Sequence, residues 1–207
     1  MLNLYLASSS LTRQQLLKDA DFSFELLSTN LQHEEPFNPE KSLKENVSTA
    51  ALFKAVATEL PSLFSTEEKT IFVISADTLI AEQQGNILKK PKNLAEGHEQ
   101  LKKLRAGPCV IGTAFIVQKF KRSSHTWILA QQIQKYNESV AEFYVPENEV
   151  DSYFEQMPYS LHACGSGIIE GYGAQFLKSF SGSYSGALGL PVFEVKETLI
   201  ELGYIKT

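Results

Sequence analysis

A strand-to-helix junction near the N-terminus places the strongest constraint on how this chain can fold. The apolar run Leu4–Ala7 has the composition of a buried strand, and Ser8-Ser9-Ser10 follows it. A helix is then predicted over Thr12–Ala20, with Arg13 in its first turn. The first N–H groups of a helix have no partner inside it, and the helix dipole adds partial positive charge there. The junction therefore predicts an anion site suited to phosphate, although serines at such turns also serve as ordinary helix caps.

A second apolar run, Ile71–Ile74, leads into Ser75-Ala76-Asp77-Thr78. A carboxylate at the end of a buried strand loses hydration, and this is unfavourable unless a partner or a ligand uses the charge. Asp77 is therefore a candidate functional residue, the alternative being a helix cap or a turn residue. The basic segment Lys89-Lys90-Pro91-Lys92 follows shortly afterwards and precedes a helix start at Asn93.

The bulk composition limits the class of protein. Of the 207 residues, 43% are hydrophobic and 21% are charged, which is ordinary for a globular protein with one sizeable core. No apolar run reaches the roughly 20 residues that span a bilayer. The formal net charge of −5 argues against general nucleic-acid binding. A polyphosphate would therefore need a local basic cluster, a divalent cation or both.

The two cysteines, Cys109 and Cys164, form neither a disulfide framework nor a spacing typical of zinc sites. The chain also begins without the basic and apolar segments of a secretory signal. We therefore expect a cytoplasmic protein with no membrane or nucleic-acid partner. The two cysteines are expected to be small packing residues.

The pattern of the whole chain predicts one compact unit over residues 1–207. The early elements are a strand over Phe22–Leu27, a polar loop over Thr29–Phe37, a helix that starts at Asn38-Pro39, and a helix capped by Asn93 that stops at Gly107. The later elements are a hairpin of Val110–Lys119 and Thr126–Gln134, a strand over Val140–Val145, a short helix from Pro146, a glycine-rich loop over Gly165–Gly173, and helices over Ala174–Phe180 and Val195–Leu202. Together they predict an α/β fold with a mixed sheet.

The short motifs of this chain resemble those of the Maf proteins, which are nucleoside triphosphate pyrophosphatases. The resemblance runs from Leu4 to about Gly203. It rests, in the family's order, on Ala7-Ser8-Ser9-Ser10-(x2)-Arg13, Ala76-Asp77-Thr78, Lys90-Pro91, Gly165-Ser166, Glu170-Gly171-(x)-Gly173 and Gly189-Leu190-Pro191. It implies an elongated mixed central β-sheet flanked by helices, with a long cleft between two lobes, as in Maf and ITPase-like folds. It is also compatible with a homodimer.

Cleavage between the α- and β-phosphates needs a water nucleophile, a base and cations that offset the phosphate charge. Asp77 is the expected base, or the activator of a metal-held water. The family pattern implies a glutamate as metal ligand or catalytic partner, and Glu34 aligns best. Glu35 can exchange roles with Glu34, or both can belong to a solvated loop. Glu34 and Asp77 would then hold Mg²⁺ or Mn²⁺.

Three basic residues are expected to act on the phosphates. Arg13 can bind a phosphate through two parallel N–H bonds. Lys54 interrupts a face of small apolar residues, so we expect it to point into a polar cleft, unless it extends to solvent. Lys90 is held in an extended geometry by Pro91, whereas its neighbours are expected to be solvated. The further phosphate contacts are expected from Ser8, Ser9, Ser10 and Thr78, of which Thr78 can alternatively be a cap.

The glycine-rich loop is expected to contact the base through Ser166 and Glu170. The resemblance implies two family branches: one acts on thymidine and uridine triphosphates with glutamine where Glu170 stands, and one acts on 7-methyl-GTP with glutamate there. A carboxylate accepts from the N1–H and N2–H₂ donors of guanine and repels the O4 acceptor of a pyrimidine. This favours 7-methyl-GTP, unless Glu170 is a surface or ion-paired residue. The segment Gly182-Ser183-Tyr184-Ser185 looks more like the pyrimidine branch.

We therefore expect a hydrolase of phosphoric anhydrides that converts a nucleoside triphosphate, with 7-methyl-GTP first, to the monophosphate and pyrophosphate. The alternative substrates are dTTP and UTP. The alternative from another class is a non-catalytic, nucleotide-binding regulator of septum formation. A carboxylate such as Asp77 facing a polyanion counts against that alternative, because binding alone does not need it.

Overall fold

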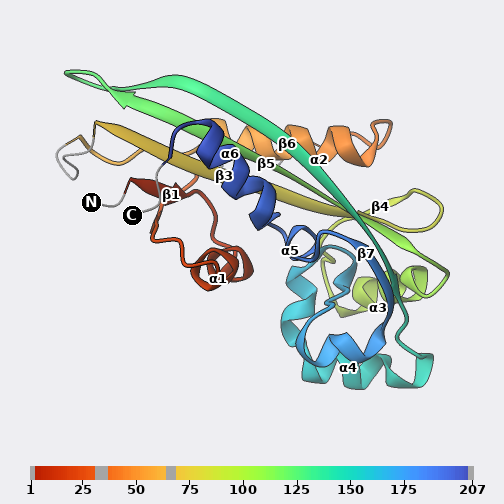
Figure 1. Cartoon of the computed structure of the whole chain (residues 1–207). Coiled ribbons are helices and arrows are strands. Elements are labelled where there is room, and N and C mark those ends of the chain that lie inside the picture. Colours follow the sequence, from red (N-terminus) through yellow and green to blue (C-terminus); the bar gives the residue numbers. More distant parts are fainter. Residues whose placement is uncertain (1–2, 31–36, 64–68, 205–207) are drawn as a thin grey trace.

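Three long neighbouring strands organise the protein in this computed structural model, which describes residues 3–30, 37–63 and 69–204. They are β3 (Thr70–Ala81), β5 (Cys109–Arg122) and β6 (Trp127–Phe143). Figure 1 shows these strands running along the molecule. The other elements are β1 (Leu4–Leu6), α1 (Leu11–Asp19), β2 (Glu25–Leu26), α2 (Leu43–Val56), β4 (Ile87–Leu88), α3 (Leu94–Leu104), α4 (Val150–Gln156), β7 (Leu177–Gly182), α5 (Tyr184–Ala187) and α6 (Val192–Glu201), with short 3₁₀ turns at Glu147–Glu149, Pro158–His162, Cys164–Ser166 and Gly171–Phe176.

The strands form one mixed sheet of seven strands in the order β2-β1-β3-β5-β6-β7, with β4 paired to β3 outside this path. The pairs of β1 with β2 and with β3 are parallel, and all other pairs are antiparallel. This confirms the predicted α/β class, with its mixed central sheet flanked by helices.

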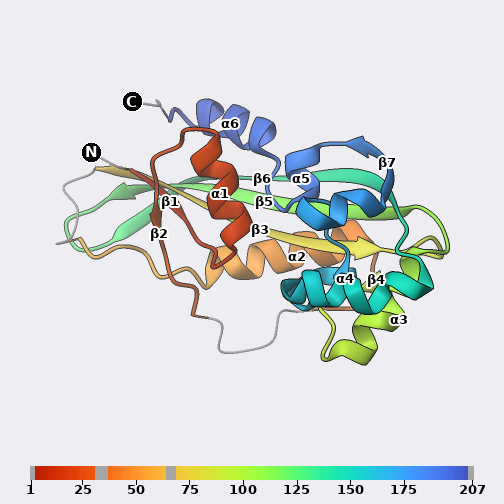
Figure 2. The ribbon, with the colours of Figure 1, turned by 90° about the horizontal axis from the view of Figure 1, so that it is seen from below.

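Successive apolar side chains along the strands point to opposite faces, so both faces of the sheet are apolar. On β5, Phe115 and Val117 pack with Val195 and Leu199 of α6, in a cluster that also holds Leu17 of α1. Their neighbours in sequence, Ala114 and Ile116, pack on the other face with Val47, Ala51 and Ala55 of α2. Successive side chains of a strand point to opposite faces, so each helix covers one side. Figure 2 shows α1 and α6 near one end of the sheet and α3 and α4 near the other.

The edge of β3 that faces β1 is open in its middle. The last pair of β1 joins Leu6 to Ile74, and the Ala7 N–H adds one bond to the Ile74 carbonyl. Pairing with β4 begins only at Ile80. In the described ranges, no strand pairs with this edge from Ser75 to Leu79. The chain leaves β1 at the same point to form the serine turn before α1.

Several predicted boundaries were wrong. Asp77 lies inside β3, not at its end, because β3 continues to Ala81 as a partner of β5. The two strands predicted over Thr126–Gln134 and Val140–Val145 are one strand, β6, since its polar middle pairs with β5 throughout. The strand predicted over Phe22–Leu27 is reduced to Glu25–Leu26.

Two helix predictions were also wrong. The helix predicted over Ala174–Phe180 is a 3₁₀ turn followed by β7, because pairing with the end of β6 overrides a spacing that resembles a helix face. The helix α2 begins after Ser42, not at Asn38, because Ser42 and Glu45 form a complete capping box. Asn38 lies in the preceding turn, where the side chain of Asn46 bonds to both its N–H and its carbonyl. No helix in the described part of the chain is long and apolar enough to cross a membrane.

We predict that Tyr153→Phe lowers the free energy of unfolding by about 1–3 kcal/mol. The buried Tyr153 hydroxyl donates to the Ser166 carbonyl at 2.8 Å and accepts from the Ile168 N–H at 3.0 Å, so it holds the glycine-rich loop. Urea unfolding measures the change, with Tyr159→Phe as the control, because Tyr159 is 52% exposed. Equal stabilities for the two variants would contradict this role for Tyr153.

Candidate active site

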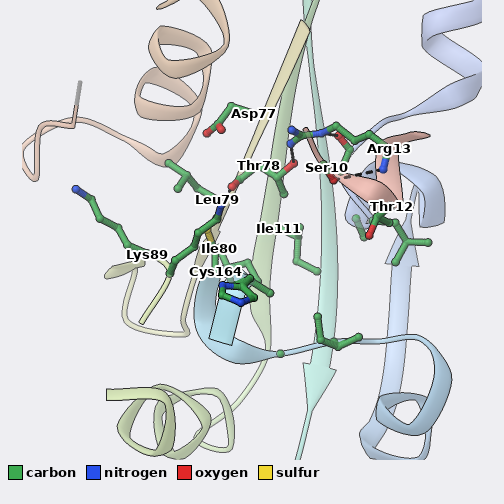
Figure 3. A pocket seen from close by; sticks show the side chains of 18 of the residues that line it. Ser10, Thr12, Arg13, Asp77, Thr78, Leu79, Ile80, Lys89, Ile111 and Cys164 are labelled. Atoms are coloured by element: carbon green, nitrogen blue, oxygen red, sulfur yellow. Dashed lines mark hydrogen bonds between the residues drawn. The ribbon is translucent and has the colours of Figure 1, made fainter. Parts of the chain in front are cut away.

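A cavity of about 630 Å³ opens beside the unpaired edge of β3. Its walls come from the start of α1, the end of α2, β3, the loop after β4, the glycine-rich loop and the segment after α5. Arg13, Asp77 and Lys90 all line it, so three residues that were predicted to act on the same triphosphate share one cavity. Figure 3 shows Arg13, Thr78 and Asp77 together, with Ile80 and Ile111 further along their strands. The cavity therefore has a polar part and an apolar part.

Arg13 is anchored at the polar part by several bonds. Its backbone N–H bonds to the side chain of Ser10, the N-cap of α1, at 3.4 Å. Its Nε donates to the Gly189 carbonyl at 2.7 Å, and its Nη2 donates to the Thr78 hydroxyl at 3.1 Å. Its Nη1 donates to Ser8 Oγ at 3.3 Å. Only 8% of Arg13 is exposed, so the guanidinium presents a fixed positive charge at the cavity wall.

Lys54 and Asp77 form an ion pair in the same wall. Lys54 Nζ lies 2.5 Å from Asp77 Oδ1, and the two side chains are 16% and 7% exposed. Lys54 reaches this position from the last turn of α2, the face that the sequence analysis expected to open onto a cleft. Asp77 therefore presents its carboxylate to the cavity beside a positive charge, where a carboxylate can accept a proton or bind a cation.

The cavity is basic although the chain as a whole is acidic. Among the described residues, five basic side chains and two carboxylates, Asp77 and Glu170, line it. The three lysines of the loop after β4, Lys89, Lys90 and Lys92, all belong to this lining and are exposed. The expectation that Lys89 and Lys92 are only solvated neighbours was therefore incomplete. Lys89 Nζ also lies 4.0 Å from the ring centre of Phe37.

The glycine-rich loop contributes Glu170 to the cavity, whereas Ser166 lies behind it. Burial raises the pKa of the Glu170 carboxyl above its usual range. Ser166 is fully buried, is absent from the lining, and its hydroxyl lies 3.4 Å from Gln100 Oε1. Ser166 thus bonds within the protein, and its contact with a base stays a prediction. Gly165, with a φ of +71°, turns the chain at this point.

The side chains of Ser8 and Ser10 in the serine turn bond mainly to other groups of the protein. Ser8 accepts from Arg13, and Ser10 caps α1, although Ser10 also lines the cavity. Ser9 is exposed and is not part of the lining. Sequence reasoning missed Phe37, Ile111, His162 and Cys164, which also line the cavity. Cys164, whose thiol bonds to the Thr78 carbonyl at 3.5 Å, stands directly before a glycine motif, and its position there was the available signal.

The predicted metal ligand Glu34 lies outside the described residues, so its place beside Asp77 stays a prediction. Within the described ranges, no group of three or more His, Cys, Asp or Glu side chains could hold a metal ion. Mg²⁺ is commonly held by only one or two carboxylates together with phosphate oxygens of a substrate. The hard oxygen donors of Asp77, in a cavity that suits phosphates, fit that mode of binding.

The comparisons with known proteins agree with the motifs. The family model for Maf-like protein matches residues 3–202, so the chain belongs to the Maf family. A protein named dTTP/UTP pyrophosphatase from Fusobacterium nucleatum is 28% identical over 96% of this chain and 95% of its own length. Another of that name, from Syntrophus aciditrophicus, is 30% identical over 97% of this chain and 90% of its own length. The solved structure of a HAM1 protein from Coxiella burnetii covers 69% of this chain and 73% of its own, with 13% identity and a TM-score of 0.39.

We predict that Gly189→Ala destabilises the protein more than Gly85→Ala does. Both glycines have a positive φ, +112° and +88°, so an alanine at either site is strained by about 1–3 kcal/mol. A Cβ at Gly85 meets nothing within 4 Å, whereas one at Gly189 lies 3.3 Å from Arg13 Nε and 3.4 Å from Thr78 Oγ1. Denaturant unfolding of both variants measures the difference. An equal loss of unfolding free energy in both variants would mean that the Arg13 side chain can move away from the added Cβ without destabilising the protein.

Proposed function

We propose that this protein is a nucleoside triphosphate pyrophosphatase, which hydrolyses its substrate to the nucleoside monophosphate and pyrophosphate. The observation that carries the proposal is the gathering of Arg13, Lys54, Asp77 and Lys90 around one cavity. Membership of the Maf family and the names of the relatives support the same chemistry. The apolar part of the cavity offers space for a nucleoside, and its polar part offers fixed positive charge for the phosphates.

The chemistry can be assigned to individual side chains. Asp77 accepts a proton from the attacking water as the new bond to the α-phosphorus forms and the bond to the bridging oxygen breaks. Lys54, paired with Asp77, lies where it can orient this carboxylate and offset charge on the phosphates. Arg13 and Lys90 offset the charge that develops on the departing pyrophosphate. Asp77, with Glu34 as the proposed second ligand, would hold a divalent cation, which would supply positive charge against the phosphates when bound.

We infer that the preferred substrates are dTTP and UTP. The names of the relatives favour this alternative over 7-methyl-GTP, which the glutamate at position 170 had placed first. Burial of Glu170 offers a way to reconcile the two observations, because it raises the pKa of this carboxyl and so favours its protonated form. A protonated carboxyl carries one donor and one acceptor, as a glutamine amide does. It can donate to pyrimidine O4 and accept from N3–H.

We predict that Asp77→Asn lowers kcat for dTTP by about 10²–10⁴-fold, because the amide cannot accept the water's proton. The measurement is release of pyrophosphate from dTTP, UTP, 7-methyl-GTP and ATP, each with Mg²⁺ and with Mn²⁺. Asp151→Asn is the control, because Asp151 is 88% exposed on α4 and is not part of the cavity lining.

Full activity of Asp77→Asn would contradict the role of this carboxylate as the base. Cleavage of none of these triphosphates by the unaltered protein would contradict the enzyme itself. Tight binding of a triphosphate without turnover would instead favour the non-catalytic regulator.

We predict that the preference for dTTP over 7-methyl-GTP increases as the pH falls through the pKa of Glu170. Because burial raises that pKa, the protonated form that donates to O4 persists to higher pH than in an exposed glutamate, and is lost above it. The measurement is the ratio of kcat/KM for the two substrates from about pH 5 to pH 8. Effects common to both triphosphates cancel in this ratio. Glu170→Gln should remove the dependence and favour dTTP throughout, and an unchanged profile would refute this.

A further inference from the structure

Behind the cavity, a closed ring of hydrogen bonds joins α1, β3, β5 and the segment after α5. Arg13 Nη2 donates to Thr78 Oγ1 at 3.1 Å, and Thr78 Oγ1 lies 2.9 Å from Thr113 Oγ1. Thr113 Oγ1 donates to the Gly186 carbonyl at 2.7 Å. The Gly189 N–H donates to that same carbonyl at 2.9 Å, and the Gly189 carbonyl accepts from Arg13 Nε at 2.7 Å. Of the ring members, Arg13, Thr78 and Gly189 line the cavity, whereas Thr113 and Gly186 do not.

The donors in the ring fix the direction of its central bond. A threonine hydroxyl has a single hydrogen, and a carbonyl can only accept. The hydrogen of Thr113 is committed to Gly186, so the bond between the two threonines must be donated by Thr78. Thr78 Oγ1 therefore has its hydrogen turned towards Thr113 and its lone pairs turned towards the guanidinium of Arg13.

This direction changes the role expected for Thr78. A hydroxyl whose hydrogen faces β5 cannot donate it to a phosphate in the cavity, so Thr78 acts as the acceptor that fixes one end of Arg13. The other end of Arg13 is fixed by the Gly189 carbonyl, whose peptide is tied to Gly186. Thr113 supports both ends, because it accepts from Thr78 and donates to Gly186.

Thr113 is well placed to be rigid. It is 1% exposed and pairs directly across the sheet from Thr78, in the register of β3 with β5. Its partner Gly186 lies in α5, whose N-cap is Ser183, and Ser139 Oγ on β6 donates to the Ser183 carbonyl. The ring therefore connects Arg13 to the most extensively paired strands of the sheet.

We propose that Thr113 is a positioning residue for the reaction, which sets the orientation of Arg13 towards the phosphates without touching the substrate itself. This inference rests on the proposed function, since it assigns the guanidinium the task of holding the phosphates. Loss of the Thr113 hydroxyl removes the acceptor of Thr78 and one of the two donors to Gly186. The guanidinium then loses the fixed orientation of two of its three acceptors among the described residues, Thr78 Oγ1 and the Gly189 carbonyl, and keeps the third, Ser8 Oγ.

The test compares Thr113→Val, which keeps the shape and removes the hydroxyl, with Thr113→Ser, which keeps the hydroxyl. We expect Thr113→Val to lower kcat/KM for dTTP about tenfold and to raise the inhibition constant of pyrophosphate by a similar factor. Thr113→Ser should stay within about twofold of the unaltered protein. In an Arg13→Ala background, Thr113→Val should have almost no additional effect, because coupled residues are not additive.

The control is Thr198→Val. Thr198 is also fully buried, and its hydroxyl bonds to the Glu194 carbonyl within α6, away from the cavity lining. All variants are assayed well below their melting temperatures. If Thr113→Val matches Thr198→Val, or if its effect adds fully to that of Arg13→Ala, the positioning role is overturned while the proposed function stands. If the unaltered protein neither cleaves dTTP nor binds its non-hydrolysable α,β-imido analogue, the proposed function fails, and this inference fails with it.

Discussion

The open edge of β3 is the constraint on which the candidate site depends. Neighbouring residues of a strand point to opposite faces of a sheet, so Asp77 and Thr78 would normally be separated by the sheet itself. Both nevertheless line one cavity, because β1 ends at Leu6 and β4 pairs only from Ile80. The cavity extends around the uncovered edge and receives Lys54 with Asp77 from one face and Arg13 with Thr78 from the other.

Charge in this protein is arranged locally. The net charge of the chain is −5, yet the charged side chains among the described lining residues are mostly basic. The two kinds of basic residue differ in how they are held. Arg13 and Lys54 are buried or half-buried and bound to fixed partners, whereas the lysines after β4 are exposed. The deep charges can thus define a geometry for phosphate, and the outer ones can attract a polyanion.

Sequence reasoning predicted the parts of the fold and site that depend on short segments. The cap at Asn93 follows from spacing alone, and the side chain of Asn93 does accept from the Glu96 N–H. The resemblance of the motifs to the Maf family identified Arg13, Asp77 and Lys90 as a set. Predicting these residues required no knowledge of contacts between distant parts of the chain.

The parts that sequence reasoning missed depend on partners far away in the chain. β7 forms because it pairs with the free edge at the end of β6. Ser166 is bonded to Gln100 of α3 and does not line the cavity. Cys164 and Phe37 became lining residues only when the loops folded over the sheet. The direction of the Thr78 hydroxyl could not be predicted from the sequence either. It follows from counting the hydrogen-bond donors and acceptors that β3, β5 and α5 bring together.

The bond from Arg13 to the Gly189 carbonyl joins residues 176 positions apart, and α6 follows directly after Gly189. An early part of the chain and one of its last parts are thus joined by a hydrogen bond at the wall of the cavity. During synthesis, Arg13 leaves the ribosome long before its acceptor exists. The cavity can be completed only after the C-terminal segment has emerged and docked. A truncated nascent chain therefore lacks the carbonyl that fixes the orientation of Arg13.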